Sequence, residues 1–364
     1  MSKLLTINNN PEIAVKEFLM FLLEKEKVSG VFSLRKVNKN GAVDYGLITD
    51  KSHLDEIVPL HPLMPINAGQ VLSRFTPIEK PIAAVIKPCE FRAFIELVKR
   101  EQGTLDNFLL ITYSCSGVFP LKENVNGSIN DQLSAYWKAT EKAEIPSEIR
   151  PTCRICEHFA PVNSDILISL IGEETGKCKM YLNTEKAEKF AEGFEGKISS
   201  EEFITSKLDS LKEKRLKEKE EVFSKINTEE SGLDGLIDVF GRCIGCHGCR
   251  NVCPICYCTL CDFESANFDY NVPILERELE EKGALRLPPD TIFFHIGRLS
   301  HMSFSCVGCG QCSDVCPANI PVASVFRKSG ERVAGIFDYV PGRDVEEEIP
   351  VMIYKEEEFQ ELGE

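Results

Sequence analysis

Two stretches of closely spaced cysteines carry the clearest chemistry in this sequence. Residues 242–254 read RCIGCHGCRNVCP and residues 305–317 read SCVGCGQCSDVCP, so each contains the pattern C-x2-C-x2-C-x3-C-P. This spacing is typical of bacterial ferredoxins, in which three cysteines of a motif hold one cubane 4Fe–4S cluster and the fourth ligates the other cluster. The pattern therefore predicts two 4Fe–4S clusters. The predicted ligands are Cys243, Cys246, Cys249 and Cys316 for cluster one, and Cys306, Cys309, Cys312 and Cys253 for cluster two.

Zinc is the main alternative for these motifs. Zinc sites usually combine two C-x2-C pairs and need neither a third cysteine nor a following Cys-Pro, so we prefer iron–sulfur clusters. Three more cysteines, Cys256, Cys258 and Cys261, follow the first motif. Their role stays open between another metal, the surroundings of a cluster and inert thiols.

Length and composition limit the remaining possibilities. The chain has 364 residues, which suffices for two or three domains, and 43% of them are hydrophobic, as in a globular protein. No apolar run is long enough to predict a transmembrane segment, and the first residues lack the pattern of a signal peptide. Ferredoxin spacing among the 16 cysteines favours a reducing, cytoplasmic location over disulfides. The net charge of −15 disfavours nucleic acid as a partner.

Four cysteines outside the motifs fall at the ends of predicted elements. Residues 82–86 predict a strand, which a turn containing Cys89 joins to an amphipathic helix, and residues 108–113 predict a strand that runs straight to Cys115. Ligands of open α/β sheets bind beyond the carboxyl ends of such strands. Cys89 and Cys115 can therefore join the C-x2-C of Cys153 and Cys156 around a third cluster. The alternative is four unrelated buried thiols, since Cys often packs as a small hydrophobe, and the residues alone leave both open.

The rest of the chain predicts an α/β domain followed by a mainly α-helical, ferredoxin-like domain with two clusters. Helices are expected at 11–27, 184–194 and 273–282, strands at 31–37, 42–48, 165–171 and 180–182, and an apolar stretch at 291–302. His53 and His61 fall in a loop, where we expect surface or internally hydrogen-bonded side chains. The predicted divisions are an α/β flavin-type domain at 1–200, a charged helical linker at 201–232, the helical ferredoxin domain at 233–340, and an acidic C-terminal arm at 341–364.

The order of motifs resembles the beta subunit family of coenzyme F-420 (deazaflavin) hydrogenases and formate dehydrogenases, in its formate dehydrogenase branch. The resemblance covers nearly the whole chain, and the Lys-Pro-Cys-Glu turn with the later C-x2-C is its most specific part. The matching stretches are 86–93 (IKPCEFRA), 114–117 (SCSG), 153–158 (CRICEH) leading to 164–166 (SDI), 253–258 (CPICYC) and, more weakly, 337–343 (FDYVPGR).

This resemblance implies properties that the spacing alone does not. Members of the family bind FAD in the α/β domain, carry a 4Fe–4S cluster beside it, and exchange a hydride with the deazaflavin. By position, Cys89, Cys115, Cys153 and Cys156 become the ligands of that third cluster. The expected flavin contacts are Lys87, Glu90, Arg92, Ser116 and Gly117. No G-x-G-x-x-G is present, so the FAD would not be held by a dinucleotide fingerprint.

The expected function is that of an electron-transfer oxidoreductase subunit, without a residue of its own as general acid or base. The expected partner is the catalytic subunit of a formate dehydrogenase or hydrogenase. The alternative is an iron–sulfur adaptor that docks a heterodisulfide-reductase-like subunit and performs no deazaflavin chemistry.

Overall fold

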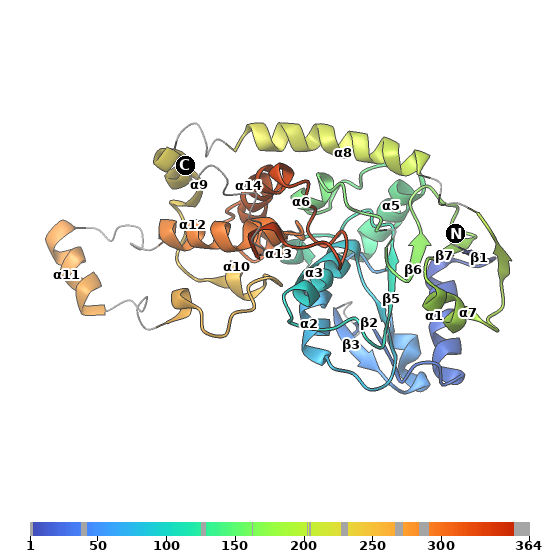
Figure 1. Ribbon diagram of the computed structural model, residues 1–364. Coiled ribbons are helices and arrows are strands. Elements are labelled where there is room, and N and C mark those ends of the chain that lie inside the picture. Colours follow the sequence, from blue (N-terminus) through green and yellow to red (C-terminus); the bar gives the residue numbers. More distant parts are fainter. Residues whose placement is uncertain are drawn as a thin grey trace, which may run out of the picture.

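A computed structural model gives the arrangement of the chain (Figure 1). It describes residues 3–37, 42–124, 129–161, 163–201, 203, 205–226, 232–265, 272–283 and 291–352. Residues 38–41, where the sequence predicts a turn between the strands of 31–37 and 42–48, and the second half of the predicted acidic C-terminal arm, residues 353–364, lie outside the described residues.

Within the described residues, eight strands form one sheet in the order β3-β2-β4-β5-β6-β7-β1-β8. The strands β2, β4, β5 and β6 are parallel at the centre, and antiparallel strands extend both edges. Val85 of β4 pairs with Ile111 of β5, and Ile111 pairs with Ile166 of β6. The strands are β1 (Lys3–Ile7), β2 (Gly30–Lys36), β3 (Val43–Ile48), β4 (Ile82–Val85), β5 (Phe108–Tyr113), β6 (Ile166–Ser169), β7 (Cys178–Leu182) and β8 (Lys197–Ser199).

Helices cover both faces of this sheet, which explains why the central strands β4, β5 and β6 are buried along their whole length and mostly apolar. Helix α1 (Pro11–Glu24) packs Val15, Phe18 and Leu22 against one face, where Val85 and Ile111 also point. Helices α2 (Ala68–Phe75) and α3 (Pro88–Lys99) cover the other face, against Ala84 and Leu110. The expected α/β region is therefore present. The remaining helices of this region are α4 (Leu121–Asn124), α5 (Ile129–Glu141), α6 (Pro151–Arg154) and α7 (Glu185–Ala191), with a 3-10 helix at Lys51–Glu56.

The turn between β4 and α3 is built as the sequence predicts. Pro88 occupies the first turn of α3, where its missing N–H costs nothing, and the Glu90 carboxylate accepts the backbone N–H of Lys87 at 2.7 Å. Cys89 therefore stands at the start of a rigid helix, directly beyond the carboxyl end of β4.

The second half of the chain is helical and lies to one side of the sheet (Figure 1). Helix α8 (Ser206–Ser224) runs from the sheet region toward α9 and buries Leu208, Leu211 and Arg215, while Glu218 and Lys219 form ion pairs with Arg154, Glu157 and Glu331. Helix α11 projects from the body of the protein (Figure 1). The helices are α9 (Gly232–Phe240), α10 (Gly248–Asn251), α11 (Val272–Lys282), α12 (Thr291–Met302), α13 (Gln311–Asp314) and α14 (Val322–Ile336), with 3-10 helices at Asp262–Glu264, Ser303–Ser305 and Pro350–Met352.

Buried polar contacts join the helical part to the sheet region. Arg150, which precedes α6, forms an ion pair of 2.6 Å with Asp314 of α13, and both side chains are buried. Arg92 of α3 donates to the carbonyls of Pro341 and Val307, and Gly342 donates its N–H to Glu96 of α3. The predicted C-terminal arm thus begins in the protein interior, because Pro341 and Gly342 are held against α3. None of the described helices is both long and apolar enough to cross a membrane.

Candidate iron–sulfur and cofactor sites

The first ferredoxin motif contributes three cysteines to one cavity in the helical part. Cys243, Cys246 and Cys249 line it together with Cys316, which comes from the second motif. The loop before α10 carries Cys243 and Cys246, α10 itself carries Cys249, and the segment after α13 carries Cys316. The structure therefore brings together the four residues that the spacing assigns to cluster one.

A second cavity holds the complementary set. Cys306, Cys309 and Cys312 of the second motif line it with Cys253 of the first. Each motif thus gives its fourth cysteine to the cavity of the other, as the ferredoxin pattern predicts. Among the residues that the structure describes, no three His, Cys, Asp or Glu side chains converge on one point as ligands of a single ion do. The thiols instead surround cavities.

Left-handed backbone residues turn both motifs around their cavities. Gly245 and Gly308 precede the second cysteine of each motif with φ of +66° and +68°, and the next left-handed positions are His247 at +54° and Gly310 at +85°. Glycine adopts this conformation without strain, whereas histidine does so at a cost. The ring of His247 stacks on Phe294 with centroids 4.2 Å apart, which helps to hold it there.

A third cavity lies where the α/β region meets the second motif. Cys89, Cys115, Cys153 and Cys156 all line it. Cys89 and Cys115 follow β4 and β5 at the carboxyl edge of the sheet, and the other two come from α6 and the residues after it. The N–H of Cys115 bonds to the carbonyl of Phe159, which draws the loop after α6 toward the end of β5. These four thiols are therefore grouped rather than scattered through the core.

Several buried thiols of these cavities resist ionisation on their own, whereas a hydrogen bond with Cys256 lowers the pKa of Cys253. Burial raises the pKa of Cys309 to about 12, and burial together with the neighbouring Cys153 raises that of Cys115 to about 12 as well. A thiolate is the form that ligates metals, and bound iron supplies the positive charge that stabilises it. Four-thiol cavities of this kind therefore fit 4Fe–4S clusters, whose ligands are cysteine thiolates.

The remaining cysteines of the first motif lie outside these cavities. Cys256 packs beside the thioether of Met302, with their sulfur atoms 3.4 Å apart, while Cys258 is exposed and Cys261 is half-buried. None of the three lines any of the three cysteine cavities.

The five predicted flavin contacts divide into two groups. Lys87 and Gly117 line the third cysteine cavity. The other three serve internal contacts: Glu90 accepts the hydroxyl of Tyr45 at 2.6 Å, Arg92 binds the two carbonyls described above, and the hydroxyl of Ser116 accepts that of Thr140 at 2.8 Å. The structure therefore places Glu90 and Ser116 in the framework of the site, where other side chains of the protein satisfy them.

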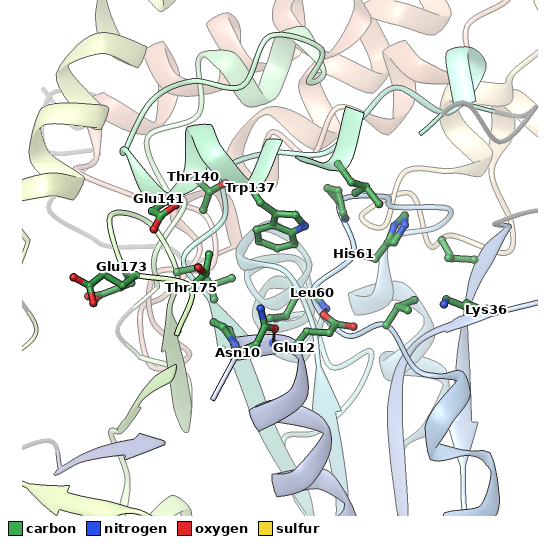
Figure 2. A pocket seen from close by; sticks show the side chains of 17 residues that line it. Asn10, Glu12, Lys36, Leu60, His61, Trp137, Thr140, Glu141, Glu173 and Thr175 are labelled. Atoms are coloured by element: carbon green, nitrogen blue, oxygen red, sulfur yellow. Dashed lines mark hydrogen bonds between the residues drawn. The ribbon is translucent and has the colours of Figure 1, made fainter. Parts of the chain in front are cut away.

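A separate, larger cavity has a volume of about 400 Å³ (Figure 2). Lys36 at the end of β2 and Leu170 just after β6 place it at the carboxyl edge of the sheet, beside the start of α1. Trp137 of α5 forms part of its wall (Figure 2). Sequence reasoning missed this cavity, although Lys36 and Leu170 both fall at ends of predicted strands and Trp137 is the sole tryptophan of the sequence.

His61 differs from the expectation for its loop. It lines the large cavity, and its buried Nδ1 has no hydrogen-bond partner. Burial, together with the nearby positive charges of Lys87 and Lys36, lowers its pKa to about 4, so the ring is neutral at pH 7. The loop of His61 also reaches the third cysteine cavity, because Met64 lines that cavity.

Glu12 at the start of α1 gives this cavity a testable pH dependence. Burial raises the pKa of its carboxyl from 4.5 to about 7, against the opposing effect of Lys16. As pH rises, the Glu12 carboxyl ionises at a lower pH in the unfolded chain than in the folded protein. The free energy of unfolding therefore falls between pH 4.5 and about pH 7, and it stays at the lower level above pH 7. We expect Glu12→Gln to stabilise the fold by about 1–3 kcal/mol at pH 8 and by almost nothing at pH 4.5, measured by denaturant unfolding. Glu17→Gln, an exposed change on the same helix, serves as control, and an equal gain at both pH values would contradict the assignment.

Comparisons with known proteins place a dicluster domain over the two ferredoxin motifs and find relatives of the whole chain. Residues 239–320 match the family model for a 4Fe-4S dicluster domain. The F420-dependent formate dehydrogenase subunit beta of Methanocaldococcus jannaschii is 30% identical over 365 residues, which cover 91% of this chain and 92% of that protein. The F420-dependent formate dehydrogenase 1 subunit beta of Methanococcus maripaludis is 29% identical over 383 residues, covering 92% and 91%. A chain from a solved F420-reducing NiFe hydrogenase complex of Methanosarcina barkeri aligns with a TM-score of 0.45 at 12% identity, over 63% of this chain and 92% of that one.

An α/β region joined to a 4Fe–4S dicluster domain defines an iron–sulfur electron-transfer subunit of an oxidoreductase. The similarity along nearly the whole chain makes the assignment more specific. The chain belongs to the family of F420-dependent formate dehydrogenase beta subunits. The family resemblance expected from the sequence is thereby confirmed.

Proposed function

We propose that this chain is an iron–sulfur flavoprotein subunit that moves electrons between FAD, which exchanges a hydride with a deazaflavin, and three 4Fe–4S clusters. The observation that carries the proposal is the row of three four-cysteine cavities. Cys309 and Gly308 line both the second and the third cavity, so these two share a wall. The ligands of the three clusters would be the twelve cysteines that line the cavities.

The shared wall supports an order for the electron path. The third cavity adjoins the flavin-type region, the second lies across Cys309, and the first is tied to the second by the exchange of Cys253 and Cys316. Cys246 of the first cavity is exposed. We therefore assign the third cluster to the flavin end and cluster one to the end where a partner is met.

The large cavity is the best-fitting place for the flavin. Trp137 and Leu60 give it apolar walls, and an end with Glu141 and Glu173 lies opposite an end with Lys36 and the neutral ring of His61 (Figure 2). Apolar walls suit a flavin ring, and carboxylates suit ribityl and ribose hydroxyls. The unpartnered Nδ1 of His61 is a polar group that a ligand would satisfy.

The residues of the chain bind and orient the flavin in this proposal. When bound, FAD supplies the conversion of a hydride, carrying two electrons, into single electrons. Trp137 would hold the ring, and the loop from His61 to Met64 would separate it from the third cysteine cavity. Since the named relatives are beta subunits, we propose that the formate-oxidising centre belongs to a separate catalytic subunit.

Cofactor analysis of anaerobically purified protein tests the function. We expect about twelve irons per chain, because each of the three cubanes contributes four. We also expect bound FAD that is reduced when F-420H2 is added. About eight irons would contradict the third cluster. Brown protein with iron but without flavin would instead favour the adaptor that docks a heterodisulfide-reductase-like partner.

Trp137→Ala tests the place of the flavin. Loss of the aromatic wall should weaken FAD binding about tenfold, the equivalent of roughly 1.4 kcal/mol, while the iron content stays unchanged. Fluorescence titration of the flavin-depleted chain with FAD measures the affinity. Phe337→Ala, which removes a half-exposed aromatic side chain next to Phe304, is the control. Unchanged FAD affinity in Trp137→Ala would place the flavin elsewhere.

A further inference from the structure

Helix α12 directs charge and hydrogen bonds toward the two ferredoxin motifs. Its buried residues are Thr291, Phe294, His295, Arg298 and Met302. The stripe thus includes a histidine and an arginine, although the buried face of a helix is ordinarily apolar. The helix belongs to the long insert between the motifs, which a compact ferredoxin does not need.

Arg298 contacts both cysteine cavities. Its Nη1 donates to Sγ of Cys249 at 3.1 Å, and its Nη2 donates to the carbonyl of the same residue at 3.2 Å. Cys249 belongs to the first cavity, whereas the Arg298 side chain itself lines the second, with Cys253 and Cys312. One guanidinium therefore lies between the two predicted clusters.

This guanidinium lacks an ordinary counter-ion. Arg298 is 3% exposed, and in the part of the chain that the structure describes no carboxylate lies within 4.0 Å of it. Its flat faces instead lie near the rings of Phe326 and Phe294, at 4.8 and 5.5 Å. A buried charge is costly unless an opposite charge compensates it. A cubane with four thiolate ligands carries net negative charge, so two such clusters would compensate Arg298.

We propose that Arg298 is the shared counter-charge of the two ferredoxin-motif clusters and raises the reduction potentials of both. The proposal rests on the cluster assignment made above. Reduction adds an electron to each cluster, and a fixed positive charge beside the ligand sulfurs favours the reduced state. A single side chain thereby shifts the reduction potentials of both clusters in the same direction, which keeps the difference between them small.

His295 provides a built-in comparison, one turn earlier on the same helix. Its Nε2 lies 3.4 Å from Sγ of Cys243, which belongs to the first cavity, and its ring stacks on Phe240 with centroids 4.0 Å apart. His295 lines the first cavity but not the second. Its influence should therefore reach cluster one, whereas that of Arg298 reaches both clusters.

Redox titration of the full chain, followed by low-temperature EPR, tests the proposal. Arg298→Met and Arg298→Gln should shift the potentials of both clusters to more negative values, and Arg298→Lys, which keeps the charge, should shift them less. His295→Phe should shift cluster one alone. Arg35→Met removes a half-exposed arginine at the sheet edge and should shift neither, which controls for the change in net charge.

Several outcomes overturn the role of Arg298. These are unshifted potentials in Arg298→Met and Arg298→Gln, a shift confined to one cluster, or an Arg298→Lys shift as large as that of Arg298→Gln. If Arg298→Met loses iron, the potentials measured in Arg298→Gln and Arg298→Lys decide the role of Arg298, because both of these variants retain a hydrogen-bond donor near Cys249. Iron analysis of the unaltered chain tests the cluster assignment separately, so wild-type protein with its clusters and an unshifted Arg298→Gln would refute the role of Arg298 alone.

Discussion

Cys316→Ser is expected to abolish the cluster of the first motif, although Cys316 stands in the second. The side chain lines the cavity of Cys243, Cys246 and Cys249, and a serine hydroxyl is a poor substitute for a thiolate ligand. Cys253→Ser should in the same way abolish the cluster of the second motif. Each change should remove about four irons per chain and one EPR signal.

Variants that replace one of the first three cysteines of a motif show which cluster is lost in Cys316→Ser and in Cys253→Ser. Cys316→Ser should match Cys246→Ser in its EPR spectrum, and Cys253→Ser should match Cys312→Ser. Cys258→Ser, which alters an exposed thiol outside the cavities, should leave iron and spectra unchanged. A Cys316→Ser spectrum that matches Cys312→Ser would show that each motif holds its own cluster, and the crossed assignment would be wrong.

The buried ion pair of Arg150 and Asp314 should dominate the stability of the junction between sheet region and helical part. Asp314→Ala leaves Arg150 buried without its counter-ion, which typically costs about 3–5 kcal/mol. Arg150 would keep its bond to the carbonyl of Met64, but that bond does not neutralise the charge. Anaerobic denaturant unfolding of the full chain measures the loss.

A double variant separates the unpaired charge from lost packing. Arg150→Met with Asp314→Leu removes both charges, so it should be less destabilised than Asp314→Ala alone. Lys3→Met breaks an exposed pair with Glu188 and should cost at most about 1 kcal/mol. A double variant less stable than Asp314→Ala would mean that the pair contributes stability beyond avoiding an unpaired charge.

The sequence predicted best those features that local spacing determines. The ferredoxin motifs encode their own turns through residues such as Gly245 and Gly308, so the grouping of their cysteines follows from spacing. The positions of Cys89 and Cys115 followed from a general property of parallel strands, because both residues come directly after one. Strands β2 to β7 were recognisable from their apolar runs or alternation.

Features that depend on distant pairing were not predictable in the same way. Strands β1 and β8 were missed, because short edge segments such as Lys3–Ile7 form strands only by pairing with β7 and with each other. The family resemblance implied Glu90 and Arg92 as flavin contacts, but residues on successive helix positions point in different directions. The large cavity combines α1, α5 and three loops, and Arg298 approaches the clusters from the insert, so neither has a local signal.

The wall that Cys309 and Gly308 form has a consequence for modularity. Residues 239–320 match the model of a 4Fe-4S dicluster domain without the α/β region. Here one face of the second cavity is also a face of the third, and Gly310 approaches Thr152 so closely that a Cβ would clash with its hydroxyl. Excising the segment would expose Cys309 on the side that the α/β region covers. In this protein the helical part and the α/β region therefore share a structural wall through Cys309 and Gly308.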